Sequence, residues 1–286
     1  MTLRVWGHPS TTLQMNYRKE FERVFTECTR TREKWTVWYD WVTCCAISIN
    51  VQVDWKHSKE REKRYADIIE KYDETARNQF AEMLALMVKD LEENPRQDFL
   101  GSMYMDLGMG DTKHGQFFTP YNVTDLTALI ALNKDEILRQ VEKRGYATVY
   151  EPTAGAGAMM LAKRWHLSNI GLGSNDVFFV AQELMNNAAM QCYLQMSLMG
   201  CAGYVCIADT LEAPAQMDGL YPVEEPGRDW WLLPSTLSDA WQLRMLAQNM
   251  KRIKWKANRR KYAKSPEPEK SPEPEPIAET GQISLF

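Results

Sequence analysis

A glycine-rich turn stands near the middle of the sequence, in Tyr150-Glu-Pro-Thr-Ala-Gly-Ala-Gly-Ala158. The run Ala147–Tyr150 before it has the composition of a β-strand, and the spacing after it predicts a helix that starts at about Ala158. Glycines let the backbone approach a ligand closely, and the first N–H groups of a helix bind a carboxylate or a phosphate. On its own, the turn fits a bound dinucleotide or a tight turn without any ligand.

Three further segments follow a regular order around this turn. His114-Gly-Gln-Phe-Phe-Thr-Pro120 precedes an amphipathic helix that begins at about Val123. The next predicted strand, Val177–Ala181, ends at Gln182-Glu183, where an acidic residue usually holds a ribose diol. A third strand, Tyr204–Ala208, ends at Asp209. Because strands and helices alternate, this region predicts an α/β fold with a parallel sheet and helices packed on it.

In this order, the segments between about residues 95 and 212 resemble the N6-adenine DNA methyltransferase family, in particular the modification subunit of type I restriction systems. In that family a Gly-Gln-Phe-Phe-Thr-Pro segment and a Glu/Asp-Pro-x-x-Gly-x-Gly turn bind S-adenosylmethionine. Here these are Gly115–Pro120 and Glu151–Gly157. The resemblance implies a Rossmann-like domain that uses S-adenosylmethionine to methylate adenine in DNA.

The resemblance also implies a role for each matching residue. Aromatic rings and a threonine before the predicted helix would cover the methionine end of the cofactor, and Glu151 with the glycine backbone would hold its amino-acid group. Glu183 would bind the ribose hydroxyls and Asp209 the adenine amino group. The expected cofactor-binding set is Gln116, Phe117, Phe118, Thr119, Pro120, Glu151, Pro152, Thr153, Gly155, Gly157, Glu183 and Asp209. Valine in place of either glycine is expected to abolish binding and leave the protein folded.

The catalytic motif of this family, Asn/Asp-Pro-Pro-Tyr/Phe, does not occur in the sequence. In the family it follows the fourth strand, binds the target amine and stacks on a flipped-out base. At the expected place, Asp218-Gly-Leu-Tyr-Pro222 has an aromatic residue and a proline in a different pattern. Later strands have no clear candidates either, so the predicted sheet is partial and the catalytic residues are unknown.

Three interpretations therefore stay open. The cofactor motifs favour the first, an active DNA adenine-N6 methyltransferase. The second is a catalytically inactive protein derived from such an enzyme, which binds DNA, a replication clamp or a restriction complex. The third is half of a split enzyme whose second chain supplies the remaining strands. A dinucleotide-dependent oxidoreductase is disfavoured, because the turn lacks the G-x-G-x-x-G spacing.

Four regions are expected along the chain. Residues 1–107 read as helical, 108–234 as the partial methyltransferase domain, 235–264 as a basic helix, and 265–286 as a disordered Pro/Glu tail. The aromatic cluster Trp35–Trp41 suits packing between helices or a partner surface. One predicted helix, which ends at Asn94-Pro95, places apolar residues near one face: Ile68, Tyr72, Phe80, Met83, Leu84, Met87 and Leu91.

The end of the chain carries two candidate binding segments. Residues 251–264 hold eight basic residues and no acidic one, which favours contacts with DNA phosphates over a merely solvated helix face. The expected nucleic-acid-binding residues are Lys251, Arg252, Lys254, Lys256, Arg259, Arg260 and Lys261. The last five residues resemble the peptide with which bacterial replication proteins bind the sliding clamp, with Gln282, Leu285 and Phe286 as contact residues.

Composition limits the remaining classes. The chain has 286 residues and a net charge of −4, so the protein as a whole is not a polycation that coats nucleic acid. No apolar run approaches the roughly 18–20 residues that span a bilayer, and the first residues lack a signal pattern, so a cytoplasmic protein without a membrane partner is expected. The six cysteines have no metal-ligand spacing and are expected to be buried thiols, with no metal site.

Overall fold

The computed structural model describes residues 16–110 and 117–262, with the backbone alone from residue 255 onward. The chain divides into two compact units, and the second begins at Leu246. The region boundaries predicted at residues 107, 234 and 264 stay predictions. Everything that positions the candidate site lies in the first unit.

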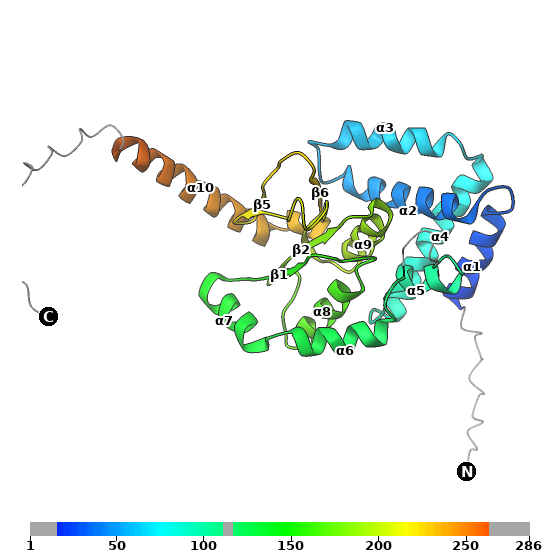
Figure 1. The fold of residues 1–286 in the computed structure, drawn as a ribbon, viewed down its shortest axis with the longest axis horizontal. Helices are drawn as coiled ribbons and strands as arrows, with labels where there is room; N and C mark the ends of the chain where they lie inside the picture. Colours follow the sequence, from blue (N-terminus) through cyan, green and yellow to red (C-terminus); the bar gives the residue numbers. More distant parts are fainter. Residues whose placement is uncertain (1–15, 111–116, 263–286) are drawn as a thin grey trace, which may run out of the picture. The chain divides into compact units, whose positions relative to one another are not determined.

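Five helices come first in the chain (Figure 1). They contribute to one hydrophobic core. Phe21 lies edge-on against Trp38, Trp41 and Phe99, and the two tryptophans are fully buried. Edge-to-face pairs of this kind stabilise helix packing beyond simple burial. The aromatic cluster therefore packs between helices, as predicted. The five helices are α1 (Tyr17–Cys28), α2 (Lys34–Asn50), α3 (Ser58–Ile69), α4 (Glu74–Glu93) and α5 (Phe99–Asp106).

The helix expected to end at Asn94-Pro95 does end there, but it is two helices rather than one. α3 stops at Ile69 and α4 starts at Glu74. The Asp73 carboxylate accepts a hydrogen bond from the Ala76 N–H at 2.8 Å, so it caps α4. The predicted apolar residues are buried, Tyr72 in the turn between the two helices and the others within them, except Leu84, which is half-buried.

A four-stranded sheet follows, with strand order β1-β2-β3-β6. β1, β2 and β3 are parallel, joined by α8 and α9, which confirms the α/β fold with a parallel sheet. β6 runs antiparallel to β3, in a segment that the sequence analysis left without strands. The bounds are β1 (Ala147–Glu151), α8 (Ala158–Ser168), β2 (Val177–Glu183), α9 (Asn186–Leu198), β3 (Ala202–Ile207) and β6 (Asp229–Leu232).

β6 was hard to predict because it is only four residues long and both faces of it are covered. Trp231 packs into the large core with α8, α9 and the N-terminal helices, and Trp230 packs into a smaller core on the other face. That smaller core includes Trp241, near the start of α10 (Asp239–Tyr262). The remaining short elements are α6 (Tyr121–Ala131), α7 (Lys134–Arg144), β4 (Met217–Asp218), β5 (Tyr221–Pro222) and a 3-10 turn at Pro234–Leu237.

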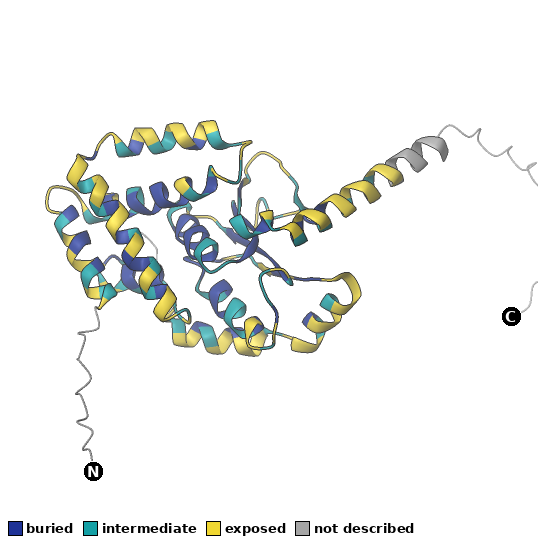
Figure 2. Cartoon of the chain, turned by 180° about the vertical axis from the view of Figure 1, so that it is seen from behind, coloured by how far each residue is buried: buried dark blue, intermediate teal, exposed yellow. Residues whose placement is uncertain are grey.

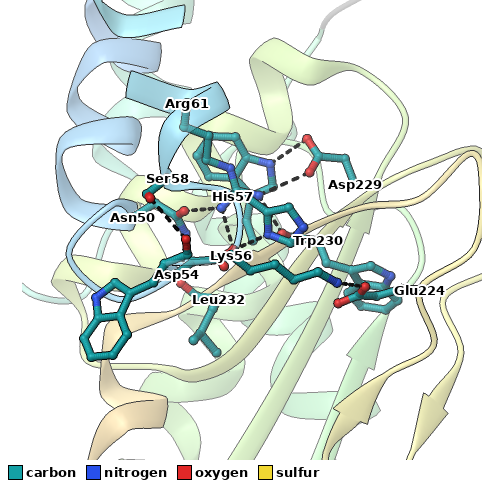
Figure 3. Close-up of polar contacts among 12 residues, drawn as sticks. Asn50, Asp54, Lys56, His57, Ser58, Arg61, Glu224, Asp229, Trp230 and Leu232 are labelled. Atoms are coloured by element: carbon teal, nitrogen blue, oxygen red, sulfur yellow. Dashed lines mark hydrogen bonds and ion pairs between the residues drawn. The ribbon is translucent and has the colours of Figure 1, made fainter. Parts of the chain in front are cut away.

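A buried arginine ties the helical region to the sheet (Figure 3). Arg61 is 5% exposed; it pairs with the Asp54 carboxylate at 2.7 Å and donates to the Trp230 carbonyl at 2.8 Å. Its guanidinium also lies 4.0 Å from the Trp231 ring centroid. Burial opposes ionisation of Asp54, but the hydrogen bond from His57 and the charge of Arg61 outweigh it, so the pKa of Asp54 lies below its ordinary value.

The six cysteines are free and buried, as predicted. Burial raises the pKa of the Cys28 thiol to about 11 and that of Cys44 to about 12. Among the residues that the structure describes, no group of three or more His, Cys, Asp or Glu could hold a metal ion. None of the described helices is long and apolar enough to cross a membrane.

Candidate cofactor site

The glycine-rich turn leaves the carboxyl end of β1 and enters α8. Both of its glycines have positive φ, 55° at Gly155 and 99° at Gly157, a region that residues with a Cβ rarely adopt. The Gly157 N–H donates to the Ala154 carbonyl at 2.8 Å, which closes the turn directly before α8. The first N–H groups of α8 therefore lie beside the turn, where they can bind an anionic group.

The two glycines have different surroundings. A Cβ at Gly157 would lie 3.1 Å from the Cys192 sulfur and 3.2 Å from the Cys192 Cα, so this glycine allows the turn to pack closely on α9. A Cβ at Gly155 would lie 3.6 Å from the Phe118 ring, an ordinary van der Waals distance. Gly155 thus faces the segment before α6, and Gly157 faces the core.

A cavity of about 350 Å³ lies between this turn and the segment before α6, within the size range of small-molecule sites. Its wall brings together two segments that are far apart in the sequence. It is lined by Phe117, Phe118, Thr119, Thr124, Thr127, Glu151, Thr153, Ala154, Gly155, Ala156, Ala158 and Met159.

Six of the predicted cofactor residues therefore share one cavity wall: Phe117, Phe118, Thr119, Glu151, Thr153 and Gly155. Pro120, Pro152, Gly157, Glu183 and Asp209 are not part of that wall. Gln116 lies outside the described residues.

Glu183 ends β2 beside the turn. One carboxylate oxygen accepts a hydrogen bond from the Gly155 N–H and the other from the Met185 N–H, both at 2.9 Å. Each oxygen keeps a second lone pair for another donor. Glu183 thus fixes the turn and still offers acceptors at the carboxyl end of the sheet.

Asp209 follows the end of β3. Its carboxylate accepts from the Leu211 N–H at 2.8 Å, which orders the start of the next loop. The neighbouring Thr210 hydroxyl donates to the Pro152 carbonyl and so joins this loop to the glycine-rich turn. Hydrogen bonds from the side chains of Glu183 and Thr210 therefore link the ends of β2 and β3 to the turn that follows β1.

Two exposed leucines stand next to these acidic residues. Leu184 is 57% exposed and Leu211 is 93% exposed. They follow β2 and β3, at the carboxyl edge where open α/β sheets bind ligands. Apolar side chains beside two acceptors suit a flat heteroaromatic ring that carries donors. The sequence analysis missed these leucines, because only their exposure distinguishes them from core leucines.

Gln182 is a further residue, to which the sequence analysis gave no role. It is fully buried; its amide nitrogen donates to the Ala208 and Ala213 carbonyls, and its amide oxygen accepts from the Tyr150 hydroxyl at 2.8 Å. These bonds hold the loop after β3 against β1 and β2. The sequence offered one signal that could have identified this residue, a glutamine inside an otherwise apolar strand.

Gln195, on α9, connects the turn to the helical region. Its amide nitrogen donates to the Asp98 carboxylate at 2.7 Å and to the Ala156 carbonyl at 2.8 Å. Asp98 is itself buried and caps α5 through the Gly101 N–H. Burial raises the pKa of Asp98 above its ordinary value. The turn is therefore fixed from α9 as well as from β2.

The predicted basic residues belong to α10, of which Lys251 and Lys254 are exposed and Arg252 is half-buried. Of the side chains of Lys256, Arg259, Arg260 and Lys261 the structure describes nothing. Gln282, Leu285 and Phe286 lie outside the described residues.

Residues 95–230 match the family model described as N-6 DNA Methylase. The matched range is just under half of the chain, and this part of the chain is similar to N-6 DNA methylases. The matched range contains β1, β2, β3, the glycine-rich turn and every described wall residue of the cavity.

One similar solved structure is a type I restriction-modification system methyltransferase subunit from Streptococcus thermophilus. It is 24% identical, with a TM-score of 0.38, and the similarity covers 63% of this chain and 36% of that chain. The chain thus spans about a third of that subunit. No curated protein sequence matches this chain significantly.

Proposed function

We propose that the chain binds S-adenosylmethionine in this cavity and acts as a DNA N6-adenine methyltransferase or as part of one. The observation that carries the proposal is the cavity itself, because the Phe117–Thr119 segment and the glycine-rich turn line the same cavity. The cradle fits the cofactor: Gly155 has no Cβ at the cavity, and α8 begins beside it.

Each part of the cofactor has a matching group. Glu151 and the first N–H groups of α8 would hold the amino-acid end, and Glu183 would accept hydrogen bonds from the ribose hydroxyls. Leu184 and Leu211 would contact the adenine ring, and Asp209 would accept a hydrogen bond from its amino group. When bound, the cofactor supplies an electrophilic methyl group on a sulfonium sulfur, and Phe117 and Phe118 shield that end of the cavity from water.

The direct experiment has two steps on the full-length protein. Titration calorimetry first measures S-adenosylmethionine binding, and transfer of labelled methyl to unmethylated DNA is then measured, with the product identified by mass spectrometry. Label in N6-methyladenine supports an active enzyme. A folded protein that binds no cofactor would overturn the proposal.

A specific feature favours the split enzyme if binding occurs without transfer. β1 is the outer strand of the sheet in the described chain, whereas doubly wound sheets continue from the first strand to a fourth. Close by in sequence, much of α6 is exposed (Figure 2). Its exposed residues include Val123, Leu126 and Ile130, at i, i+3 and i+7. A second polypeptide that supplies the missing strands would cover both surfaces. Transfer that appears only after co-expression with the neighbouring genes would support this candidate.

DNA is the proposed substrate, held in part by the basic end of α10. K251E combined with K254E should weaken DNA binding and lower its salt dependence. The C-terminal peptide is proposed to bind the bacterial sliding clamp, so deletion of Gln282–Phe286 should abolish clamp binding and leave cofactor affinity unchanged. Clamp binding by the truncated chain would exclude that peptide as the docking segment.

A further inference from the structure

An ion pair joins Glu151, which lines the cavity, to Lys163, to which the assignments above give no role. The Lys163 ammonium lies 2.8 Å from Glu151 Oε2, and the two side chains are only 12% and 17% exposed. Glu151 lines the cavity directly. Lys163 is on α8, four residues after the wall residue Met159, so both side chains leave the same face of the helix.

The pair has unused hydrogen-bonding capacity. A lysine ammonium has three N–H donors, and within the described part of the chain Glu151 takes one of them. Glu151 uses Oε2 for this bond, and Oε1 has no hydrogen-bond partner among the described residues. Burying two charges for one contact is costly unless a further polar group completes the arrangement.

We propose that Lys163 determines specificity for the amino-acid end of the cofactor by binding its α-carboxylate, while Glu151 binds the α-ammonium. This inference rests on the proposed function. A positive and a negative group 2.8 Å apart match the two charges of an α-amino acid, so that each charge of the ligand meets an opposite charge. The N-terminus of α8 adds a favourable potential for the same carboxylate.

A purely structural role for Lys163 makes a different prediction. If the lysine only neutralises Glu151, it competes with the ligand ammonium, and its removal should leave binding unchanged or make it tighter. The two roles can be separated by ligands that differ in one charged group. S-adenosylmethionine has both charges, decarboxylated S-adenosylmethionine keeps only the ammonium, and 5′-methylthioadenosine has neither.

The experiment measures dissociation constants of the three ligands for the wild-type chain, K163M, K163R and the control K143M. Lys143 is an exposed lysine on α7, away from the cavity wall. Wild type and K143M should prefer S-adenosylmethionine over its decarboxylated form roughly tenfold to hundredfold, the range of one hydrogen bond to a charged group. K163M should lose this preference, K163R should keep most of it, and affinity for 5′-methylthioadenosine should be the same in all four proteins.

Two results would overturn the inference alone: an unchanged preference in K163M, or an equal loss for all three ligands. Circular dichroism and a thermal melt of K163M establish that the variant is folded. If folded wild-type protein binds none of the three ligands, the proposed function is refuted, and with it this inference. Tight binding of 5′-methylthioadenosine together with an unchanged preference would keep the proposed function and exclude the role of Lys163.

Discussion

Alanine substitutions at the two glycines of the turn test two properties separately, the stability of the fold and the binding of the cofactor. G155A and G157A both place an alanine at positive φ, which costs about 1–2 kcal/mol. Only at Gly157 does the new Cβ also meet neighbouring atoms closely, at 3.1 Å and 3.2 Å from Cys192, and overpacking of a core typically costs about 1–3 kcal/mol more.

G157A should therefore be destabilised by about 2–5 kcal/mol in total, and G155A by about 1–2 kcal/mol. For a unit of this size, the loss in G157A corresponds to a Tm decrease of about 4–20 °C. The expectation from the sequence treated the two glycines alike, whereas these values separate them. The difference arises because the Gly157 Cβ would point at the backbone of α9.

The assay is urea and thermal unfolding followed by circular dichroism, with S-adenosylmethionine affinity measured on the same samples below the transition. G155A should stay folded and bind the cofactor more weakly, since its methyl group enters the cavity wall. Equal stability of the two variants would refute the packing argument. Unchanged affinity in G155A would refute the placement of the cofactor against this turn.

Three other predictions follow from single side chains. E183Q alters the side chain that accepts hydrogen bonds from the Gly155 and Met185 N–H groups, so it should lower cofactor affinity by about tenfold or more. The control E142Q, on the exposed face of α7, should leave the affinity unchanged. Calorimetry measures the affinity of both variants. Because the pKa of Asp54 is below its ordinary value of 3.8, its ion pair with Arg61 stabilises the fold above that pH and loses this effect as the pH falls through the folded-state value. D54N should therefore lower the Tm at pH 7 and differ progressively less from wild type below about pH 3.8; a constant difference would contradict the assignment. A thiol reagent should react slowly with all six buried cysteines in the native protein and rapidly after denaturation, and fast reaction of any native thiol would show that it is exposed.

Most of the fold, and about half of the candidate site, could be predicted from the local spacing of residues in the sequence. The strands at 147–151, 177–183 and 202–207, the turn between β1 and α8, and the end of α4 are set by short-range patterns of apolar residues, glycines and a proline. The break before α4 was missed because the capping residue Asp73 interrupts an apolar spacing that continues across it. β6 was missed because both tryptophans of a four-residue strand are buried, one on each face.

The sequence by itself determined which segments carry residues suited to ligand binding, because acidic residues and glycines at strand ends are recognisable from their neighbours in the chain. Only the tertiary structure decided how these segments meet. It placed Phe118 against Gly155, separated Gly157 from the cavity by its packing on Cys192, and brought Gln195 between Asp98 and Ala156. These contacts join residues tens of positions apart, and their distances depend on how helices pack on the sheet. A local pattern can fix a turn or a cap, but long-range packing decides which side chains face the same cavity.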